Sequence, residues 1–163
     1  MTKRKPSIGV IGGGEASEET LKIAYDVGKY IAGNGAVLVS GGLGGVMEAA
    51  SRGAAENGGV VVGIIPGLDM TAANDSVSIV IPSGMGHARN ALVVNSSDAL
   101  IAFPGKFGTL SEIGLALASG KTVVYLPGAW NLRKIEPLDA SLYKEAFDAF
   151  SAVGLALDAL RKK

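Results

Sequence analysis

Short runs of apolar, largely β-branched residues alternate along this chain with longer stretches whose apolar residues recur at helical spacing. The runs lie at residues 8–11, 36–39, 60–65, 77–81, 99–103 and 122–126, and the helical patterns at residues 17–32, 46–57, 86–96, 110–119 and 141–160. Runs that are apolar on both faces are typical of a parallel sheet covered by helices. The alternation predicts one α/β domain over residues 1–163, a Rossmann-like doubly wound parallel sheet of about six or seven strands with helices on both faces.

The composition excludes several classes of protein. The 15 Lys and Arg residues balance the 15 Asp and Glu residues, so the net charge is zero and no general nucleic-acid binder is expected. The chain has no Cys, which excludes disulfides, thiolate zinc sites and a Cys nucleophile, and its one His cannot form a His-rich metal site. No apolar run reaches the ~18 residues of a membrane span. The basic segment at residues 1–6 is followed by too few apolar residues for a signal peptide, so a cytoplasmic protein is expected.

The last helical pattern carries an apolar stripe at near-heptad spacing. The stripe consists of Tyr143, Ala146, Phe150, Val153, Leu157 and Leu160. Its polar face has no basic bias, which favours core or dimer packing over a membrane face. Residues 66–76 and 127–139 are the two long loops, and the first is either a lip over a site or a plain connection. Trp130, in the second, either anchors its loop or stacks on a base.

The glycines gather where three of the predicted strands end, at residues 12–14, at residues 41–45, and at Gly105 and Gly108. In an open parallel sheet these ends form one edge, where ligands bind. Glycine there lets backbone N–H groups approach a ligand, and a helix beginning after such a turn offers unpaired donors to an anion. Three such turns favour a site for a phosphate-bearing ligand. Neither standard phosphate-binding motif is complete. Ser17 occupies the last position of the dinucleotide fingerprint G-x-G-x-x-G, where a glycine is required, and no Gly-Lys-Ser/Thr of a P-loop precedes a helix.

The most specific segment spans residues 102–112, where a strand ends, Pro104 and Gly105 turn the chain, and a helix opens at Gly108. The Thr109 hydroxyl and the free N–H groups are candidates for holding phosphate oxygens. Glu112 lies one turn further on. It either pairs with Thr109 in a capping box, or faces the sheet edge, where its carboxylate would contact a sugar or a water molecule.

Three charged or titratable side chains accompany these turns. Arg89 follows the fourth predicted strand at the same edge, where it either contacts a phosphate or ribose oxygen or is a surface residue. His87, two residues earlier, is expected to cap or pack rather than to catalyse. Lys106 either adds positive charge beside the phosphate or is exposed.

Residues 40–47, Arg89 and residues 104–112 resemble, in that order, the "possible lysine decarboxylase" superfamily over roughly residues 7–127. This group includes LONELY GUY-type cytokinin riboside 5′-monophosphate phosphoribohydrolases and molybdenum-cofactor carrier proteins, and the likeness is closer to the carrier-like Rossmann nucleotide-binding branch. The resemblance implies a homodimer or homotetramer. It does not imply decarboxylation, because no residue is marked as a Schiff-base lysine.

The resemblance also assigns site residues. The hydrolases carry a P-G-G-x-G-T-x-x-E motif. In this chain Lys106 stands in place of the motif's second glycine, and Asn90 stands in place of the lysine that follows the family's arginine. By resemblance, Arg89 and Glu112 are the candidate catalytic pair. The candidate ligand- and phosphate-binding residues are Gly12, Gly13, Gly14, Ser40, Gly41, Gly42, Gly44, Gly45, Met47, Pro104, Gly105, Lys106, Phe107, Gly108 and Thr109.

Three functions fit these residues. The first is a carrier that binds a phosphorylated nucleotide-like ligand, either molybdopterin or a nucleoside monophosphate. The second is a phosphoribohydrolase that cleaves the N-glycosidic bond of a purine riboside 5′-monophosphate, with Glu112 on the ribose or water and Arg89 stabilising an oxocarbenium-like transition state. The third is a nucleotide sensor without catalysis. None of them requires a metal, a resident cofactor, nucleic acid or a membrane.

Overall fold

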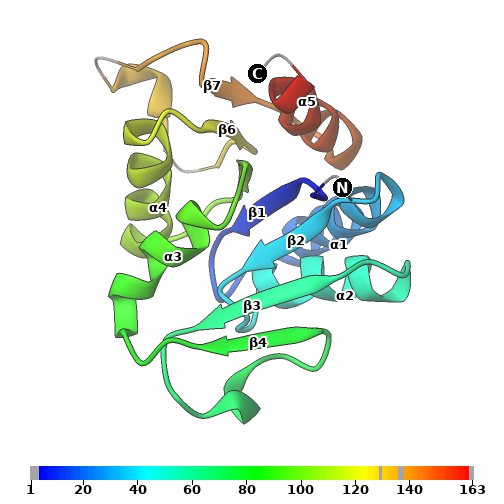
Figure 1. The fold of residues 1–163 in the computed structure, drawn as a ribbon. Coiled ribbons are helices and arrows are strands. Elements are labelled where there is room, and N and C mark those ends of the chain that lie inside the picture. The colour runs from blue at the N-terminus through cyan, green and yellow to red at the C-terminus, as the bar shows by residue number, and fades with distance from the viewer. Residues whose placement is uncertain (1–3, 129, 136–137, 162–163) are drawn as a thin grey trace.

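The computed structural model describes residues 4–128, 130–135 and 138–161, which form a seven-stranded, fully parallel sheet (Figure 1). The strands are β1 (Ser7–Ile11), β2 (Val37–Ser40), β3 (Val61–Ile65), β4 (Ile79–Pro82), β5 (Ala99–Ala102), β6 (Thr122–Tyr125) and β7 (Tyr143–Glu145). Their spatial order is β4-β3-β2-β1-β5-β6-β7, so the chain builds outward from β1 in one direction and then crosses to β5. The predicted doubly wound Rossmann-like sheet is confirmed, and the crevice between β1 and β5 is its topological switch point.

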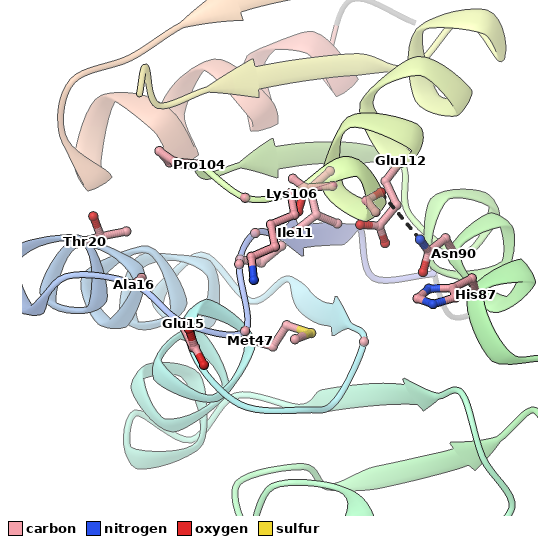
Figure 2. A pocket seen from close by; sticks show the side chains of 18 of the residues that line it. Ile11, Glu15, Ala16, Thr20, Met47, His87, Asn90, Pro104, Lys106 and Glu112 are labelled. Carbon is pink, nitrogen blue, oxygen red and sulfur yellow. Dashed lines mark hydrogen bonds between the residues drawn. The ribbon is translucent and has the colours of Figure 1, made fainter. Parts of the chain in front are cut away.

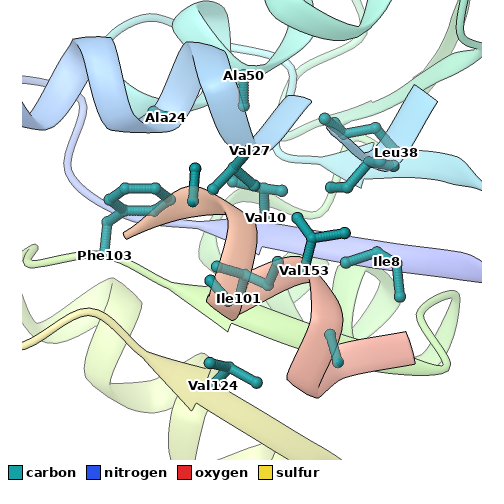
Figure 3. Close-up of a cluster of buried hydrophobic side chains, with 14 of the residues drawn as sticks. Ile8, Val10, Ala24, Val27, Leu38, Ala50, Ile101, Phe103, Val124 and Val153 are labelled. Carbon is teal, nitrogen blue, oxygen red and sulfur yellow. The ribbon is translucent and has the colours of Figure 1, made fainter. Parts of the chain in front are cut away.

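Helices cover both faces of the sheet. The structure contains α1 (Glu18–Gly33), α2 (Val46–Glu56), α3 (Asn90–Asn95), α4 (Phe107–Ala118) and α5 (Ala149–Arg161), with short 3-10 helices η1 (Met70–Ala72), η2 (Gly86–Arg89) and η3 (Leu132–Lys134). One buried apolar cluster joins the sheet to α1, α2 and α5 (Figure 3), and a second joins it to α3 and α4. Strands such as β5, whose four residues are all buried, contribute side chains to both clusters, which explains why their sequence is apolar without alternation.

Two glycines allow α1 and α2 to pack closely. A Cβ on Gly28 would collide with the carbonyl of Ala50 in α2, and a Cβ on Gly53 would collide with the carbonyl of Tyr25 in α1. The two helices therefore approach to backbone contact. This contact fixes α1 and α2 side by side on one face of the sheet.

The predicted helix over residues 141–160 is wrong in its first eight residues. Residues Tyr143–Glu145 form β7, which pairs with β6 in register Val123↔Tyr143, and α5 begins only at Ala149. The carboxylate of Asp148 accepts a 2.8 Å hydrogen bond from the Ser151 N–H and so fixes the helix start. Phe150, expected on the packed stripe, is 73% exposed, because the buried face of α5 is centred on Ala149, Ala152, Val153 and Ala156.

Smaller differences concern the helices nearest the carboxyl edge. The single helix expected over residues 86–96 is divided into η2 and α3, and α4 starts at Phe107, earlier than the expected residue 110. The 66–76 loop contains η1 and is anchored by Asn74, whose N–H donates to the Gly42 carbonyl at 2.8 Å. Trp130 packs against the second apolar cluster, which favours the loop-anchor interpretation.

Candidate functional site

The three glycine-rich turns meet, as the sequence predicted. The Gly13 N–H donates to the Pro104 carbonyl at 3.0 Å, and the Val46 N–H donates to the Gly13 carbonyl at 3.0 Å. The turn after β1 is therefore hydrogen-bonded on one side to the turn after β5 and on the other to the start of α2. Backbone hydrogen bonds therefore link the three junctions.

Two glycines in these turns are required by close approach. Gly45 has φ +66° and lies so near Gly13 and Gly14 that a Cβ would overlap their backbone atoms. Gly105 lies against the Thr109 side chain, and a Cβ there would collide with the hydroxyl oxygen. A side chain at Gly45 would therefore force two turns apart, and one at Gly105 would displace Thr109.

A cavity of about 660 Å³ opens over the junctions at the carboxyl ends of β1, β2 and β5 (Figure 2). Twelve of the predicted site residues line it: Gly12, Gly13, Gly14, Gly41, Met47, Arg89, Pro104, Gly105, Lys106, Gly108, Thr109 and Glu112. In Figure 2, Thr20 and Pro104 lie at one end of the cavity, and Glu112, Asn90 and His87 lie at the other. The volume is within the range of small-molecule sites.

The N-terminus of α4 faces this cavity. Lys106 precedes the helix without forming a side-chain cap, and the first intrahelical bond runs from the Leu110 N–H to the Lys106 carbonyl at 3.1 Å. The preceding N–H groups, which include those of the cavity residues Gly108 and Thr109, have no acceptor within the helix. Together with the positive end of the helix dipole, they form a site suited to an anion.

Glu112 does not cap this helix. Thr109 is the third residue of α4 rather than its N-cap, and no hydrogen bond joins it to Glu112 in the part of the chain that is described. The capping-box interpretation is therefore wrong. The carboxyl of Glu112 is only 7% exposed and points toward Asn90 and His87 in the cavity (Figure 2).

Arg89 and Glu112 influence each other electrostatically across the cavity. Burial raises the pKa of Glu112 to about 7, and the positive charge of Arg89 opposes this rise. Burial lowers the pKa of Arg89, and the carboxylate of Glu112 opposes that change. Arg89 is 8% exposed, which excludes the surface interpretation, and its Nη1 donates to the Ile64 carbonyl at 2.9 Å. Its Nε is buried and has no hydrogen-bond partner among the described residues.

Five predicted residues do not line the cavity. Ser40 is fully buried, and its hydroxyl accepts a hydrogen bond from the Gly42 N–H, so these two residues shape the turn from behind. Gly44 and Gly45 lie against the Gly13–Gly14 backbone, also behind the surface. Phe107 is 86% exposed and does not line the cavity.

The sequence interpretation missed the contribution of α1. Glu15, Ala16, Ser17 and Thr20 line the cavity, because the chain passes directly from the first glycine turn into the start of α1. Their position in the sequence, directly after the glycines at residues 12–14, could have indicated them. Asn90 and His87 also line the cavity, the former with a long 3.5 Å hydrogen bond to the Gly108 carbonyl. No residue of the 66–76 loop does, so the lip interpretation is not supported.

The described residues contain neither a cluster of metal ligands nor a helix that could span a membrane. No group of three or more His, Cys, Asp or Glu side chains is placed to hold a metal ion within residues 4–128, 130–135 and 138–161. Over the same ranges, no helix is both long and apolar enough to cross a bilayer.

Known proteins similar to this chain include molybdenum-cofactor proteins and cytokinin riboside 5′-monophosphate phosphoribohydrolases. The molybdenum cofactor binding protein from Rippkaea orientalis superposes with a TM-score of 0.91 at 39% identity, covering 98% of this chain and 99% of that chain. The Moco carrier protein from Chlamydomonas reinhardtii gives 0.90 at 39% identity, covering 98% and 100%. The cytokinin riboside 5′-monophosphate phosphoribohydrolase of Mycobacterium tuberculosis is 36% identical over 106 residues, which cover 63% of this chain and 56% of that protein.

The two groups differ in how much of their length is shared. The two molybdenum-cofactor proteins match this chain almost from end to end, whereas the alignment spans about half of the hydrolase. Both groups agree with the resemblance found in the sequence. The SLOG cluster4 family matches residues 5–150, and the chain belongs to this family.

Proposed function

We propose that this protein binds a phosphorylated pterin- or nucleotide-like compound in the cavity over the glycine turns and carries it without chemical change. The observation that carries the proposal is the convergence of three backbone turns and the uncapped start of α4 on one cavity. Backbone N–H groups that are fixed before the ligand arrives bind an anion with little loss of conformational entropy.

The side chains around the cavity favour carriage over hydrolysis. Lys106 and Asn90 stand where the hydrolase motif has glycine and lysine, so the two departures lie within the phosphate and catalytic segments. Arg89 already donates to the Ile64 carbonyl, which ties its guanidinium to the end of β3. The end-to-end similarity to carrier proteins adds independent support.

The test is calorimetric titration of the purified protein with molybdopterin and with AMP. Thr109→Val removes the hydroxyl beside Gly105 while keeping the shape of the side chain, and we expect it to weaken binding about tenfold. Thr122→Val is the matched control, because Thr122 is buried in β6 away from the cavity. Absence of binding by both ligands, or equal losses in the two variants, would contradict the proposal.

Hydrolysis is the second candidate, and the buried pair of Arg89 and Glu112 favours it. A carboxyl with a pKa of about 7 can exchange a proton at neutral pH, as acid–base catalysis requires. Incubation with AMP and N6-substituted AMP, followed by chromatography for free base and ribose 5-phosphate, separates the candidates. Base release that is lost in Glu112→Ala would establish hydrolysis. Binding without base release would establish carriage or sensing.

A further inference from the structure

A second, smaller cavity adjoins the one over the glycine turns. Its volume is about 270 Å³, and Thr20 and Pro104 line both cavities. These two residues lie at the end of the main cavity away from Glu112 and His87 (Figure 2). A ligand whose phosphate lies at the start of α4 can therefore extend past Pro104 into the side cavity.

One aromatic side chain at the side cavity is largely exposed. Phe103 and Leu126 line the cavity but are almost completely buried, whereas Phe147 is 76% exposed and offers a ring face to a ligand. Exposure of so much aromatic surface is unfavourable, and a ring stacked on Phe147 would remove it from water. Phe150 is similarly exposed, but its ring contacts Tyr30 and does not line the cavity.

Glu19 is the only ionisable side chain among the described residues that line the side cavity. A carboxylate only accepts hydrogen bonds, and its two oxygens match two adjacent N–H donors. The 2-amino-4-oxopyrimidine ring of a guanine or a pterin presents such a pair, namely a ring N–H beside an amino group. Adenine instead presents an unprotonated ring nitrogen beside its amino group, which would repel one carboxylate oxygen.

We propose that the side cavity binds the ring of the ligand, and that Glu19 selects a 2-amino-4-oxopyrimidine ring over adenine. This inference rests on the proposed function, because the phosphate anchors the ligand in the main cavity. It also directs the ring away from Arg89 and Glu112. The ring would then lie outside the reach of that pair, in keeping with carriage rather than glycosidic cleavage.

The experiment compares the affinities of GMP, neopterin monophosphate, AMP and ribose 5-phosphate by calorimetry. We expect GMP or the pterin to bind about tenfold more tightly than AMP, and ribose 5-phosphate to bind more weakly than either. Glu19→Gln should remove the preference over AMP and leave ribose 5-phosphate unchanged. Its matched control is Glu18→Gln, in the same first turn of α1 but outside the cavity.

The aromatic wall has its own pair of variants. Phe147→Ala should weaken all ring-bearing ligands several-fold without affecting ribose 5-phosphate, whereas Phe150→Ala should affect none. If ribose 5-phosphate binds but the ring adds no affinity, or AMP binds best, the side-cavity inference is overturned and the proposed function stands. If no phosphorylated ligand binds, both are overturned. The relative affinities of GMP and the pterin show which source of the ring is preferred.

Discussion

The buried carboxyl of Glu112 makes the stability of this protein depend on pH in a direction that can be worked out. Burial raises its pKa to about 7 from an ordinary value of 4.5, against the opposing charge of Arg89. Below pH 4.5 the group is protonated in both the folded and the unfolded chain. As pH rises toward 7, the unfolded chain releases the proton first, so stability is lost through this range and levels off above it.

The size of the effect follows from the two pKa values. A pKa difference between about 7 and 4.5 corresponds to about 3 kcal/mol at ~1.4 kcal/mol per unit, which is an upper limit for the free energy of unfolding lost by pH 8. Glu112→Gln keeps the shape and removes the titration. We therefore expect the variant to gain stability relative to the wild type as pH rises, by up to about 3 kcal/mol.

Urea unfolding of both proteins at several pH values between 4.5 and 8 measures this difference directly. Because the two proteins share every other titrating group, the difference between their free energies of unfolding isolates the contribution of Glu112. Glu18→Gln, which removes an exposed carboxylate from α1, corrects for the general effect of losing one negative charge. A Glu112→Gln difference that does not change with pH, or that falls as pH rises, would refute the reasoning.

Two further predictions concern stability. The hydrogen bond from Arg4 is the main cause that lowers the pKa of Asp98 to about 2. Asp98→Asn should therefore lower the free energy of unfolding by about 1–2 kcal/mol at pH 7. In the same urea assay this difference should disappear as pH falls from about 4 to 2. Gly53→Ala should lower the free energy of unfolding by about 1–3 kcal/mol, because its Cβ would meet the Tyr25 carbonyl. Gly154→Ala, in open space on α5, should instead be neutral or stabilising by up to ~1 kcal/mol, and equal effects at the two sites would exclude the helix contact as the cause.

The strands could be predicted because most of them are buried on both faces. β5 and β6 are four-residue segments without one exposed position, and such a segment leaves an uninterrupted apolar run in the sequence. β7 leaves none. It has three residues, Tyr-Lys-Glu, and its pairing with β6 depends on backbone hydrogen bonds at the sheet edge. The sequence signal that was available was Asp148, whose capping position marks where α5 begins.

The site could be predicted only as far as the backbone determines it. Glycines after successive parallel strands indicate the edge at which the turns lie, and the hydrogen bonds from Gly13 and Val46 agree with that expectation. Which atoms form these hydrogen bonds depends on the tertiary structure and could not be predicted from the sequence. Residues such as Ser40 and Gly42 were assigned to ligand binding because they belong to the same turn, whereas the structure uses them to support it.

A site made of backbone groups has a consequence for specificity. Main-chain N–H groups recognise the charge of an anion and carry no information about the rest of the ligand, so they are compatible with a nucleotide, a pterin or a sugar phosphate alike. Discrimination must therefore come from side chains beyond the turns. At one end of the cavity these are Glu112, Asn90 and His87, and at the other end Thr20 leads to Glu19. Burial raises the pKa of the Glu112 carboxyl to about 7 beside the buried Arg89 at the first end, whereas Glu19 at the second end is an exposed acidic side chain, so the two ends offer a ligand ring different surroundings.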